Sequence, residues 1–192
     1  MWVENTGVNS KIFKKFEKLK IDLSRMDSAL VAYSGGVDSS FLLAVAKTVL
    51  GDKVLACTAK SELYSDEELE NAKKFADSIK VRHIFIDFDI LEDEKFLSNS
   101  KERCYYCKSR LLSKLLKLAQ EHNLNYVIDG TNASDINDFR PGMRALKEFG
   151  VRSPLLEVGL KKNEIRLLAK KMRLPNWDKP QNACFATRFP YG

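Results

Sequence analysis

Three of the four cysteines have a spacing that could bind a metal. Cys104 and Cys107 are three residues apart in R-C-Y-Y-C-K, and Cys184 lies far along the chain in N-A-C-F-A-T-R. If the first pair begins a helix, both sulfurs lie on one face, and Arg103 and Lys108 beside them would favour thiolate over thiol. Three thiolates suit an iron–sulfur cluster with one iron that lacks a protein ligand, or an open zinc site, whereas three unrelated buried cysteines are the structural alternative.

A second group of polar residues forms the loop S-G-G-V-D-S-S, which follows an apolar segment and opens an apolar helix. Two glycines allow an anion to approach the backbone, and the N–H groups at a helix N-terminus point toward it. A carboxylate in such a loop requires a divalent cation, and Mg²⁺ with a polyphosphate supplies one. We therefore expect this loop to bind pyrophosphate and Mg²⁺ through Ser34, Gly35, Gly36, Asp38, Ser39 and Ser40.

Short apolar segments alternate with helical periodicity around these motifs, which predicts an α/β fold. The predicted strands are Ala29–Tyr33, Val54–Thr58, Ile84–Phe88 and Tyr126–Asp129. The predicted helices are Ser39–Leu50, Asp66–Ile79, Tyr105–His122 and Lys161–Met172. We expect a parallel five-stranded sheet with helices on both faces, with ligands beyond the carboxyl ends of the strands. Cys57, inside the second strand, is interpreted as a core residue.

Composition limits the classes of protein. The 192 residues are 44% hydrophobic and 30% charged, which fits one folded domain and excludes a mostly disordered chain. The longest apolar stretch, Phe41–Ala46, is far shorter than the roughly 20 residues that cross a bilayer. The N-terminus resembles no signal peptide, so we expect a cytoplasmic protein. Residues 141–192 hold 11 basic and 4 acidic residues, a local charge of +7, which suits an anionic ligand or merely a solvated helix face.

The S-G-G-V-D-S-S loop resembles the pyrophosphate loop of the PP-loop ATP pyrophosphatase superfamily, which has an adenine nucleotide alpha hydrolase-like fold. Members cleave ATP between its α and β phosphates, adenylate a substrate oxygen and let a nucleophile displace AMP. The resemblance implies that the backbone around Thr58, in Cys57-Thr58-Ala59, lines the adenine. It also implies that Gly130 and Thr131, in G-T-N, lie near the ATP phosphates.

Four longer motifs in order resemble the LarE family of ATP-dependent sulfur transferases. They are R-C-Y-Y-C-K, D-G-T-N-A-S-D-I-N-D-F-R-P-G, G-V-R-S-P-L-L-E-V-G-L-K-K-N-E-I-R and W-D-K-P-Q-N-A-C-F-A-T-R-F-P-Y-G. That family converts a carboxylate of pyridinium-3,5-biscarboxylic acid mononucleotide into a thiocarboxylate during synthesis of the nickel-pincer cofactor. The match begins at Ala29, so residues 1–28 are predicted to be an N-terminal capping helix and residues 29–192 the PP-loop domain.

The resemblance also implies cofactors and roles. ATP, Mg²⁺ and a 4Fe-4S cluster are expected, with the cluster on Cys104, Cys107 and Cys184 and a sulfide supplied by an unidentified donor. Cys184, Asp38 and Arg152 are the expected catalytic residues, and Arg140, Arg144 and Arg188 are expected to bind the phosphate of a small nucleotide substrate or to form surface ion pairs. Family members usually continue beyond Gly192 with a region that contributes to oligomer contacts, so a homo-oligomer is neither predicted nor excluded.

Four alternatives remain open from the sequence. Cys184 could be a sacrificial sulfur donor. The chain could be a tRNA 2-thiolation enzyme of the same superfamily, although no zinc-ribbon cysteine pairs or RNA-binding appendage supports nucleic-acid binding. It could also be a non-catalytic module that binds zinc or a cluster beside a nucleotide, or an amide-forming synthetase, which would need no cysteines in its site.

Overall fold

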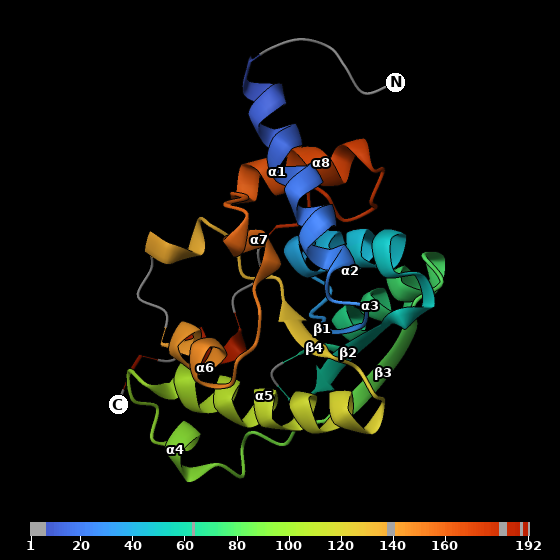
Figure 1. Cartoon of the computed structure of the whole chain (residues 1–192). Coiled ribbons are helices and arrows are strands. Elements are labelled where there is room, and N and C mark those ends of the chain that lie inside the picture. The colour runs from blue at the N-terminus through green and yellow to red at the C-terminus, as the bar shows by residue number, and fades with distance from the viewer. Residues whose placement is uncertain (1–6, 63, 138–140, 181–183, 189, 192) are drawn as a thin grey trace.

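The computed structural model describes residues 7–62, 64–137, 141–180, 184–188 and 190–191 (Figure 1). The strands are β1 (Ala29–Ala32), β2 (Val54–Lys60), β3 (Arg82–Asp87) and β4 (Tyr126–Asp129). The helices are α1 (Gly7–Ser24), α2 (Val37–Leu50), α3 (Asp66–Ser78), α4 (Glu94–Leu97), α5 (Arg103–Glu121), α6 (Gly142–Glu148), α7 (Pro154–Glu157) and α8 (Lys162–Lys171). Three short 3₁₀ helices are η1 (Gly51–Lys53), η2 (Asp135–Asn137) and η3 (Phe185–Arg188).

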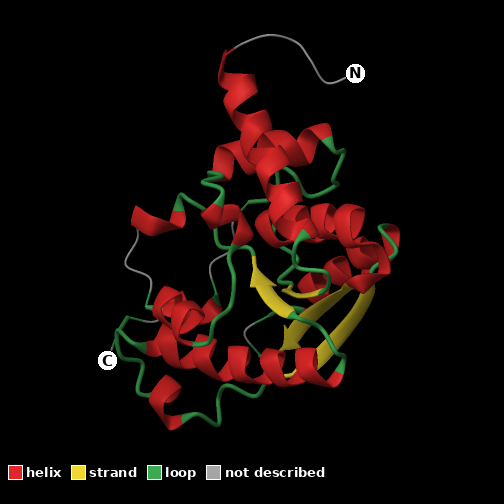
Figure 2. Cartoon of the chain, in the orientation of Figure 1, coloured by secondary structure: helices red, strands yellow, loops and turns green. Residues whose placement is uncertain are grey.

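The strands form one parallel sheet in the order β3-β2-β1-β4, with helices on both faces (Figure 2). The predicted α/β fold and parallel sheet are confirmed, but the prediction of five strands is wrong for the described residues, which form four. Among the described residues, only Arg152 pairs with the outer side of β4, as a single parallel bridge to Ile128. Gly150, with a φ of 66°, precedes this bridge, and Pro154 begins α7 two residues after it, so the chain has no length for a fifth strand.

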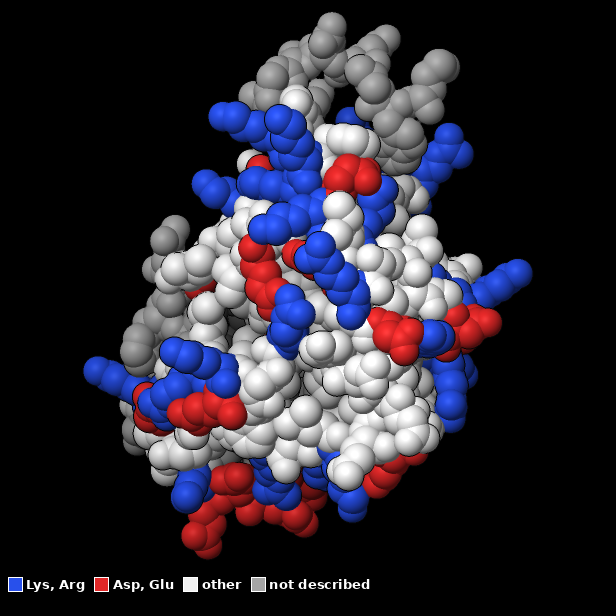
Figure 3. All heavy atoms as spheres, in the orientation of Figure 1, with Lys and Arg blue, Asp and Glu red and all other residues white. Residues whose placement is uncertain are grey.

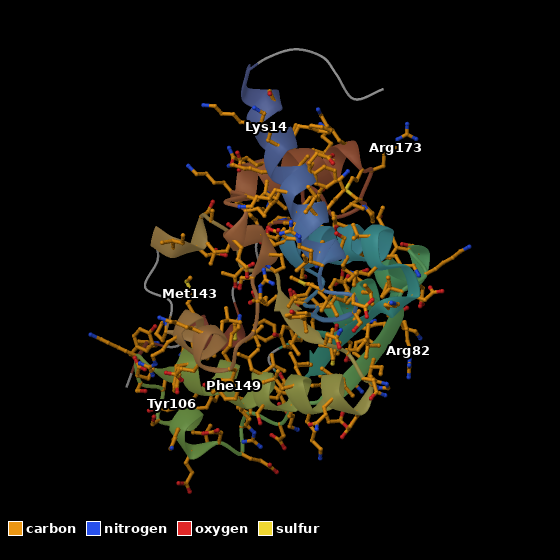
Figure 4. All side chains as sticks on the ribbon, in the orientation of Figure 1. Lys14, Arg82, Tyr106, Met143, Phe149 and Arg173 are labelled. Atoms are coloured by element: carbon orange, nitrogen blue, oxygen red, sulfur yellow. The ribbon has the colours of Figure 1, made fainter. Side chains whose placement is uncertain are left out.

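Alternate residues of the strands supply two separate cores. Ala29 and Val31 of β1 face a large core shared with α1, α2, α3, α7 and α8. Leu30, between them, faces a second core formed with α5 and α6, against which Phe149 also packs (Figure 4). Cys57 belongs to this second core, as predicted, and it is 2% exposed. The two layers hold the carboxyl ends of all four strands at one edge.

Helix α1 covers the outside of the first layer, where it packs against α2 and α7 (Figure 1). Leu19 and Leu23 on its inner face have no exposed surface, and the Phe16 ring lies 6.0 Å from that of Phe41. Lys15 Nζ also donates to Glu164 of α8 at 2.8 Å. The described part of α1 therefore packs over the outside of this layer, and the division into residues 1–28 and 29–192 stays a prediction.

Charge is unevenly spread over the surface. On the face in Figure 3, lysine and arginine side chains gather over α1 and α8, whereas acidic side chains lie along the edge that carries α4. In the described part of the chain, no helix combines the length and the apolar character that a membrane crossing requires.

Candidate functional site

The phosphate loop, residues Ser34–Ser40, joins the carboxyl end of β1 to the N-terminus of α2. Gly35 has a φ of 72°, a conformation that other residues rarely adopt, and Gly36 is the N-cap of α2. The Ser34 amide donates to Ser39 Oγ at 3.3 Å, and the two serine hydroxyl oxygens are 3.1 Å apart. The loop thus gathers hydroxyls at a helix N-terminus, where the backbone N–H groups favour an anion.

Ser40 is the member of the loop whose hydroxyl is used inside the protein. It is fully buried, donates to Tyr33 Oη at 3.4 Å and accepts from Asn176 Nδ2 at 2.7 Å. Asn176 Nδ2 also lies 3.3 Å from the Gly35 carbonyl oxygen, which it reaches from the segment after α8. The hydrogen bonds of Ser40 and Asn176 therefore stabilise the conformation of the loop.

Asp38, in the first turn of α2, meets a lysine from the distant helix α8. Lys162 Nζ donates to Asp38 Oδ2 at 2.5 Å, whereas Oδ1 is buried and no donor among the described residues reaches it. Burial raises the pKa of Asp38, although the hydrogen bond from Lys162 opposes this shift. A buried carboxylate oxygen without a partner is a suitable Mg²⁺ ligand, since magnesium prefers oxygen donors.

The end of β4 lies directly against the phosphate loop. A Cβ placed on Gly130 would lie 2.9 Å from the Ser39 backbone nitrogen and 3.1 Å from the Ser39 Cα. Only glycine fits this contact without a shift of the backbone. The close approach brings Thr131, the next residue, to the same cavity as the loop.

Asp129, the last residue of β4, links the sheet to the helix that carries the cysteine pair. It is 4% exposed and accepts from Lys108 Nζ, Thr131 Oγ1 and Ser153 Oγ, each at 2.7 Å. Despite burial, the charge and hydrogen bond of Lys108, together with the hydroxyl donors, lower the pKa of Asp129. Because Lys108 follows Cys107, this ion pair fixes the first turns of α5 over the site.

The Thr58 hydroxyl, at the carboxyl end of β2, is used in the sheet. It donates to the Tyr33 carbonyl oxygen at 2.7 Å and lies 2.8 Å from His83 Nε2. The Thr58 hydroxyl has one proton, so Nε2 is the donor to it. Burial lowers the pKa of His83, which keeps the ring neutral. This network holds the Cys57–Ala59 backbone, the part predicted to line the adenine.

One cavity of about 370 Å³ joins the phosphate loop to the cysteines. Of the predicted ATP-binding residues, those that line it are Ser34, Gly36, Asp38, Ser39, Thr58, Gly130 and Thr131. Cys104, Cys107 and Cys184 line the same cavity. Gly35 instead lines a second cavity, and Ser40 is buried. The structure therefore brings together two motifs that are about 70 residues apart and the distant Cys184.

The three cysteines differ in environment. Cys104 and Cys184 are exposed, whereas Cys107 is partly buried. Burial raises the pKa of Cys107 to about 12, with further contributions from Cys184 and Cys104, and Lys108 only partly opposes them. The prediction that flanking cations favour the thiolate is thus wrong for Cys107, because desolvation is the larger effect. A metal centre would supply the positive charge that this thiolate needs.

The donor set that could hold a metal centre consists of cysteines. Among the described residues, no group of three His, Cys, Asp or Glu side chains is arranged to hold a single metal ion. Cys104, Cys107 and Cys184 do line one cavity, together with the core residue Cys57. Three thiols on one cavity are compatible with a 4Fe-4S cluster and with an open zinc site.

The predicted arginines lie outside the described lining of the cavity. Arg152 forms a two-pronged ion pair with Glu157 at the sheet edge, and Arg144 pairs with Glu102 at 2.6 Å and lies 3.8 Å from the Tyr105 ring centroid. Arg140 lies outside the described residues, and Arg188 belongs to η3 but its side chain is not described. The roles given to these arginines stay predictions, and the geometry of Arg144 and Arg152 gives them no support.

Sequence reasoning missed Lys162, Asn176 and the pairing of Lys108 with Asp129. Lys162 contacts the phosphate loop through Asp38, whereas Lys161, Lys170 and Lys171 of the same basic segment are exposed. Each missed contact joins residues far apart in the chain, and no local pattern in one sequence marks such a pair.

A family model described as "Queuosine biosynthesis protein QueC" matches residues 28–188. The chain belongs to this QueC-like family of PP-loop ATP pyrophosphatases. An uncharacterized protein from Synechocystis sp., slr1717, is 44% identical over 93% of this chain and 66% of its own length. The pyridinium-3,5-bisthiocarboxylic acid mononucleotide synthase of Lactiplantibacillus plantarum is 37% identical over 88% of this chain and 62% of its own length.

The second of these relatives confirms the LarE resemblance predicted from the four motifs. The chain spans 66% and 62% of the lengths of these two relatives. NMN synthetase from Francisella tularensis superposes with a TM-score of 0.69 at 20% identity, covering 89% of this chain and 75% of its own. The U34-tRNA thiolase NcsA from Methanococcus maripaludis, solved with its 4Fe-4S cluster, superposes with a TM-score of 0.67 at 16% identity over 94% of this chain and 69% of its own. These structures confirm that this member of the QueC-like family has the PP-loop fold.

Proposed function

We propose that this QueC-like protein is an ATP-dependent sulfur transferase of the LarE type. It adenylates a carboxylate of pyridinium-3,5-biscarboxylic acid mononucleotide, releases pyrophosphate and converts the acyl adenylate into a thiocarboxylate. The observation that carries the proposal is the single cavity that the phosphate loop shares with Cys104, Cys107 and Cys184. The name of the Lactiplantibacillus plantarum relative supports the choice of substrate.

The phosphate loop would hold the departing pyrophosphate. Ser34 and Ser39 supply hydroxyl donors, and Asp38 supplies its unpaired oxygen to Mg²⁺. Positive charge at the helix N-terminus and on Mg²⁺ stabilises the charge that develops as the bond between the α and β phosphates breaks. The Thr58 backbone would contact the adenine, and Gly130 and Thr131 would contact the phosphates.

Cys104, Cys107 and Cys184 would hold the 4Fe-4S cluster, which would present a sulfide from a separate donor to the activated carboxylate. The acyl adenylate is an electrophile, so a hydrosulfide forms the new carbon–sulfur bond as the bond to AMP breaks. Lys108, held by Asp129 between the cysteines and the loop, would attract the anionic reactants. Cys184 and Asp38 remain the proposed catalytic residues.

The remaining proposals concern four arginines and the place where the protein acts. Arg140, Arg144 and Arg188 would bind the substrate phosphate, Arg152 would assist catalysis, and the protein would act in the cytoplasm without nucleic acid. The roles of Arg144 and Arg152 require these two side chains to turn toward the cavity when substrate binds, because both pair with carboxylates in the free protein.

The test supplies the anaerobically reconstituted protein with ATP, Mg²⁺, sulfide and the biscarboxylic mononucleotide. We expect pyrophosphate and AMP in equal amounts and a thiocarboxylate product by mass spectrometry, all three abolished in Asp38→Ala. Release of pyrophosphate that depends on tRNA rather than on the mononucleotide would overturn the assignment. One turnover per chain, with conversion of Cys184 to dehydroalanine, would instead identify a sacrificial donor.

A further inference from the structure

The C-terminal segment, residues 184–191, is held at its described positions by the corner between α4 and α5. The segment carries Cys184. Its Ala186 packs against a third, small hydrophobic core that contains Phe96 and that Cys107 also contacts. Cys184 thus depends for its position on contacts that this segment makes with the corner.

Asn99, between α4 and α5, connects the corner to the segment. Its backbone has a left-handed φ of 48°, which asparagine tolerates. Its side-chain Nδ2 donates to the Pro190 carbonyl oxygen at 2.5 Å, and its Oδ1 accepts from Arg103 Nη1. One amide therefore bonds both to the segment and to the first residue of α5.

Arg103 gives the connection a second contact. Its guanidinium carbon lies 5.2 Å from the centroid of the Tyr191 ring, within cation–π range. Arg103 is 4% exposed, and none of the described carboxylates forms an ion pair with it. Because a buried cation requires compensation, the Asn99 oxygen and the Tyr191 ring are the partners that keep Arg103 in place.

We propose that Asn99, Arg103 and Tyr191 form a latch that holds Cys184 beside Cys104 and Cys107. Arg103 immediately precedes Cys104, so the same contacts position both the first cysteine of the pair and the segment with the third. These three are positioning residues, and their importance for sulfur transfer rests on the proposed function. The latch itself rests on contacts of the metal-free chain.

The test measures the rate at which a bifunctional reagent bridges two cysteines in protein that holds no cluster. In a background that carries Cys57→Ala and Cys104→Ala, only Cys107 and Cys184 remain. Dibromobimane fluoresces strongly once it bridges two neighbouring thiols, and peptide mapping confirms the bridge. We expect Asn99→Gly and Tyr191→Leu each to lower the bridging rate several-fold, while single alkylation by monobromobimane does not slow.

Matched variants separate the latch from general destabilisation. Asn99→Gly preserves the left-handed backbone, and the same change at Asn123, which has a φ of 54° beyond the other end of α5, should leave bridging unchanged. Tyr191→Phe retains the ring and should keep the bridging rate of the background protein. Because Tyr191 is 53% exposed, neither Tyr191→Leu nor Tyr191→Phe leaves a cavity in a core. Equal bridging rates in all variants, or no bridging in the background protein, would overturn the latch.

A second readout tells the latch from the proposed function. In the chain with all four cysteines, reconstituted anaerobically, we expect Tyr191→Leu to lose iron several-fold faster than Tyr191→Phe during incubation with a chelator. If no variant binds iron, the cluster proposal fails and the bridging result still decides the latch. If all variants retain iron equally and bridge equally, the latch fails while the sulfur-transferase proposal stands.

Discussion

Asp38 combines a buried carboxylate with one lysine partner, and this environment makes stability depend on pH. Burial raises the pKa of Asp38 above its ordinary value of 3.8, so the folded state binds the proton more tightly than the unfolded chain. The stability that Asp38 contributes is therefore present below about pH 4 and is lost as pH rises through the folded pKa. Asp38→Asn removes this loss, because the amide does not titrate.

We expect the free energy of unfolding of the wild type to fall relative to Asp38→Asn as pH rises from about 4 through the folded pKa of Asp38. Urea unfolding of the metal-free proteins at several pH values measures the difference, from which the opposite contribution of Asp129 cancels. Loss of the Lys162 partner adds an offset that does not change with pH in this range. Parallel curves for the two proteins would show that burial does not perturb Asp38.

The cysteines allow a direct test of the proposed cluster through its iron and sulfide content. After anaerobic reconstitution we expect about four irons and matching acid-labile sulfide per chain in the wild type, and loss of both in Cys104→Ala. Cys57→Ala is the matched control, because Cys57 lies on β2 in the second core and should leave the iron content intact. We also expect Cys184→Ala to abolish sulfur transfer while part of the pyrophosphate release survives.

Near-normal thiolation in Cys184→Ala would contradict both the cluster and the sacrificial mechanism. Absence of iron from the wild type would favour the sacrificial one. The two motifs that carry this chemistry were recognisable from sequence because each is local: the loop spans seven consecutive residues and the cysteine pair four. Lys162 and Asn176 were not, because their contacts with the phosphate loop arise only when α8 and the following segment pack against α2.

At the scale of elements, Gly130 fixes the distance between β4 and α2. We expect Gly130→Ala to lower the free energy of unfolding by about 1–3 kcal/mol, because its Cβ would overlap the Ser39 backbone nitrogen at 2.9 Å. Calorimetry should also show weakened Mg·ATP binding, since the shift separates Thr131 from the loop. Denaturant unfolding measures the stability.

Gly142→Ala provides the control for this change. Its added Cβ would meet its nearest atom at 3.5 Å, an ordinary contact, and it lies in the first turn of α6. This variant should keep or slightly raise the stability, by up to about 1 kcal/mol. Equal effects of the two substitutions would mean that the close approach of β4 to α2 does not constrain the site.

Element type was predictable because strands and helices differ in apolar period, and each of the four strands was placed within about two residues. The strand count was not, since Val151 and Arg152 are too short a stretch to show alternation and their pairing is with β4, far back in the chain. The helices α4, α6 and α7 were also not predicted. They have four to seven residues, which is too few for a helical period to stand out.

At the scale of the whole molecule, the site joins segments from the whole length of the domain. The phosphate loop follows β1, Thr58 lies near the carboxyl end of β2, Gly130 follows β4, the cysteine pair opens α5, and Cys184 precedes η3. A ligand that contacts the first three of these segments binds only the folded chain. Its binding free energy therefore adds to the stability of the entire fold.

We accordingly expect Mg·ATP at about one hundred times its dissociation constant to raise the free energy of unfolding by about 2.7 kcal/mol. For a chain of this size that corresponds to a rise in the unfolding temperature of roughly 5–10 °C, measured by scanning fluorimetry. Asp38→Asn should lose the part of the rise that requires Mg²⁺, because it lacks the charged oxygen that binds the metal. A rise equal in both proteins would place the metal elsewhere, and no rise in the wild type would contradict nucleotide binding at the phosphate loop.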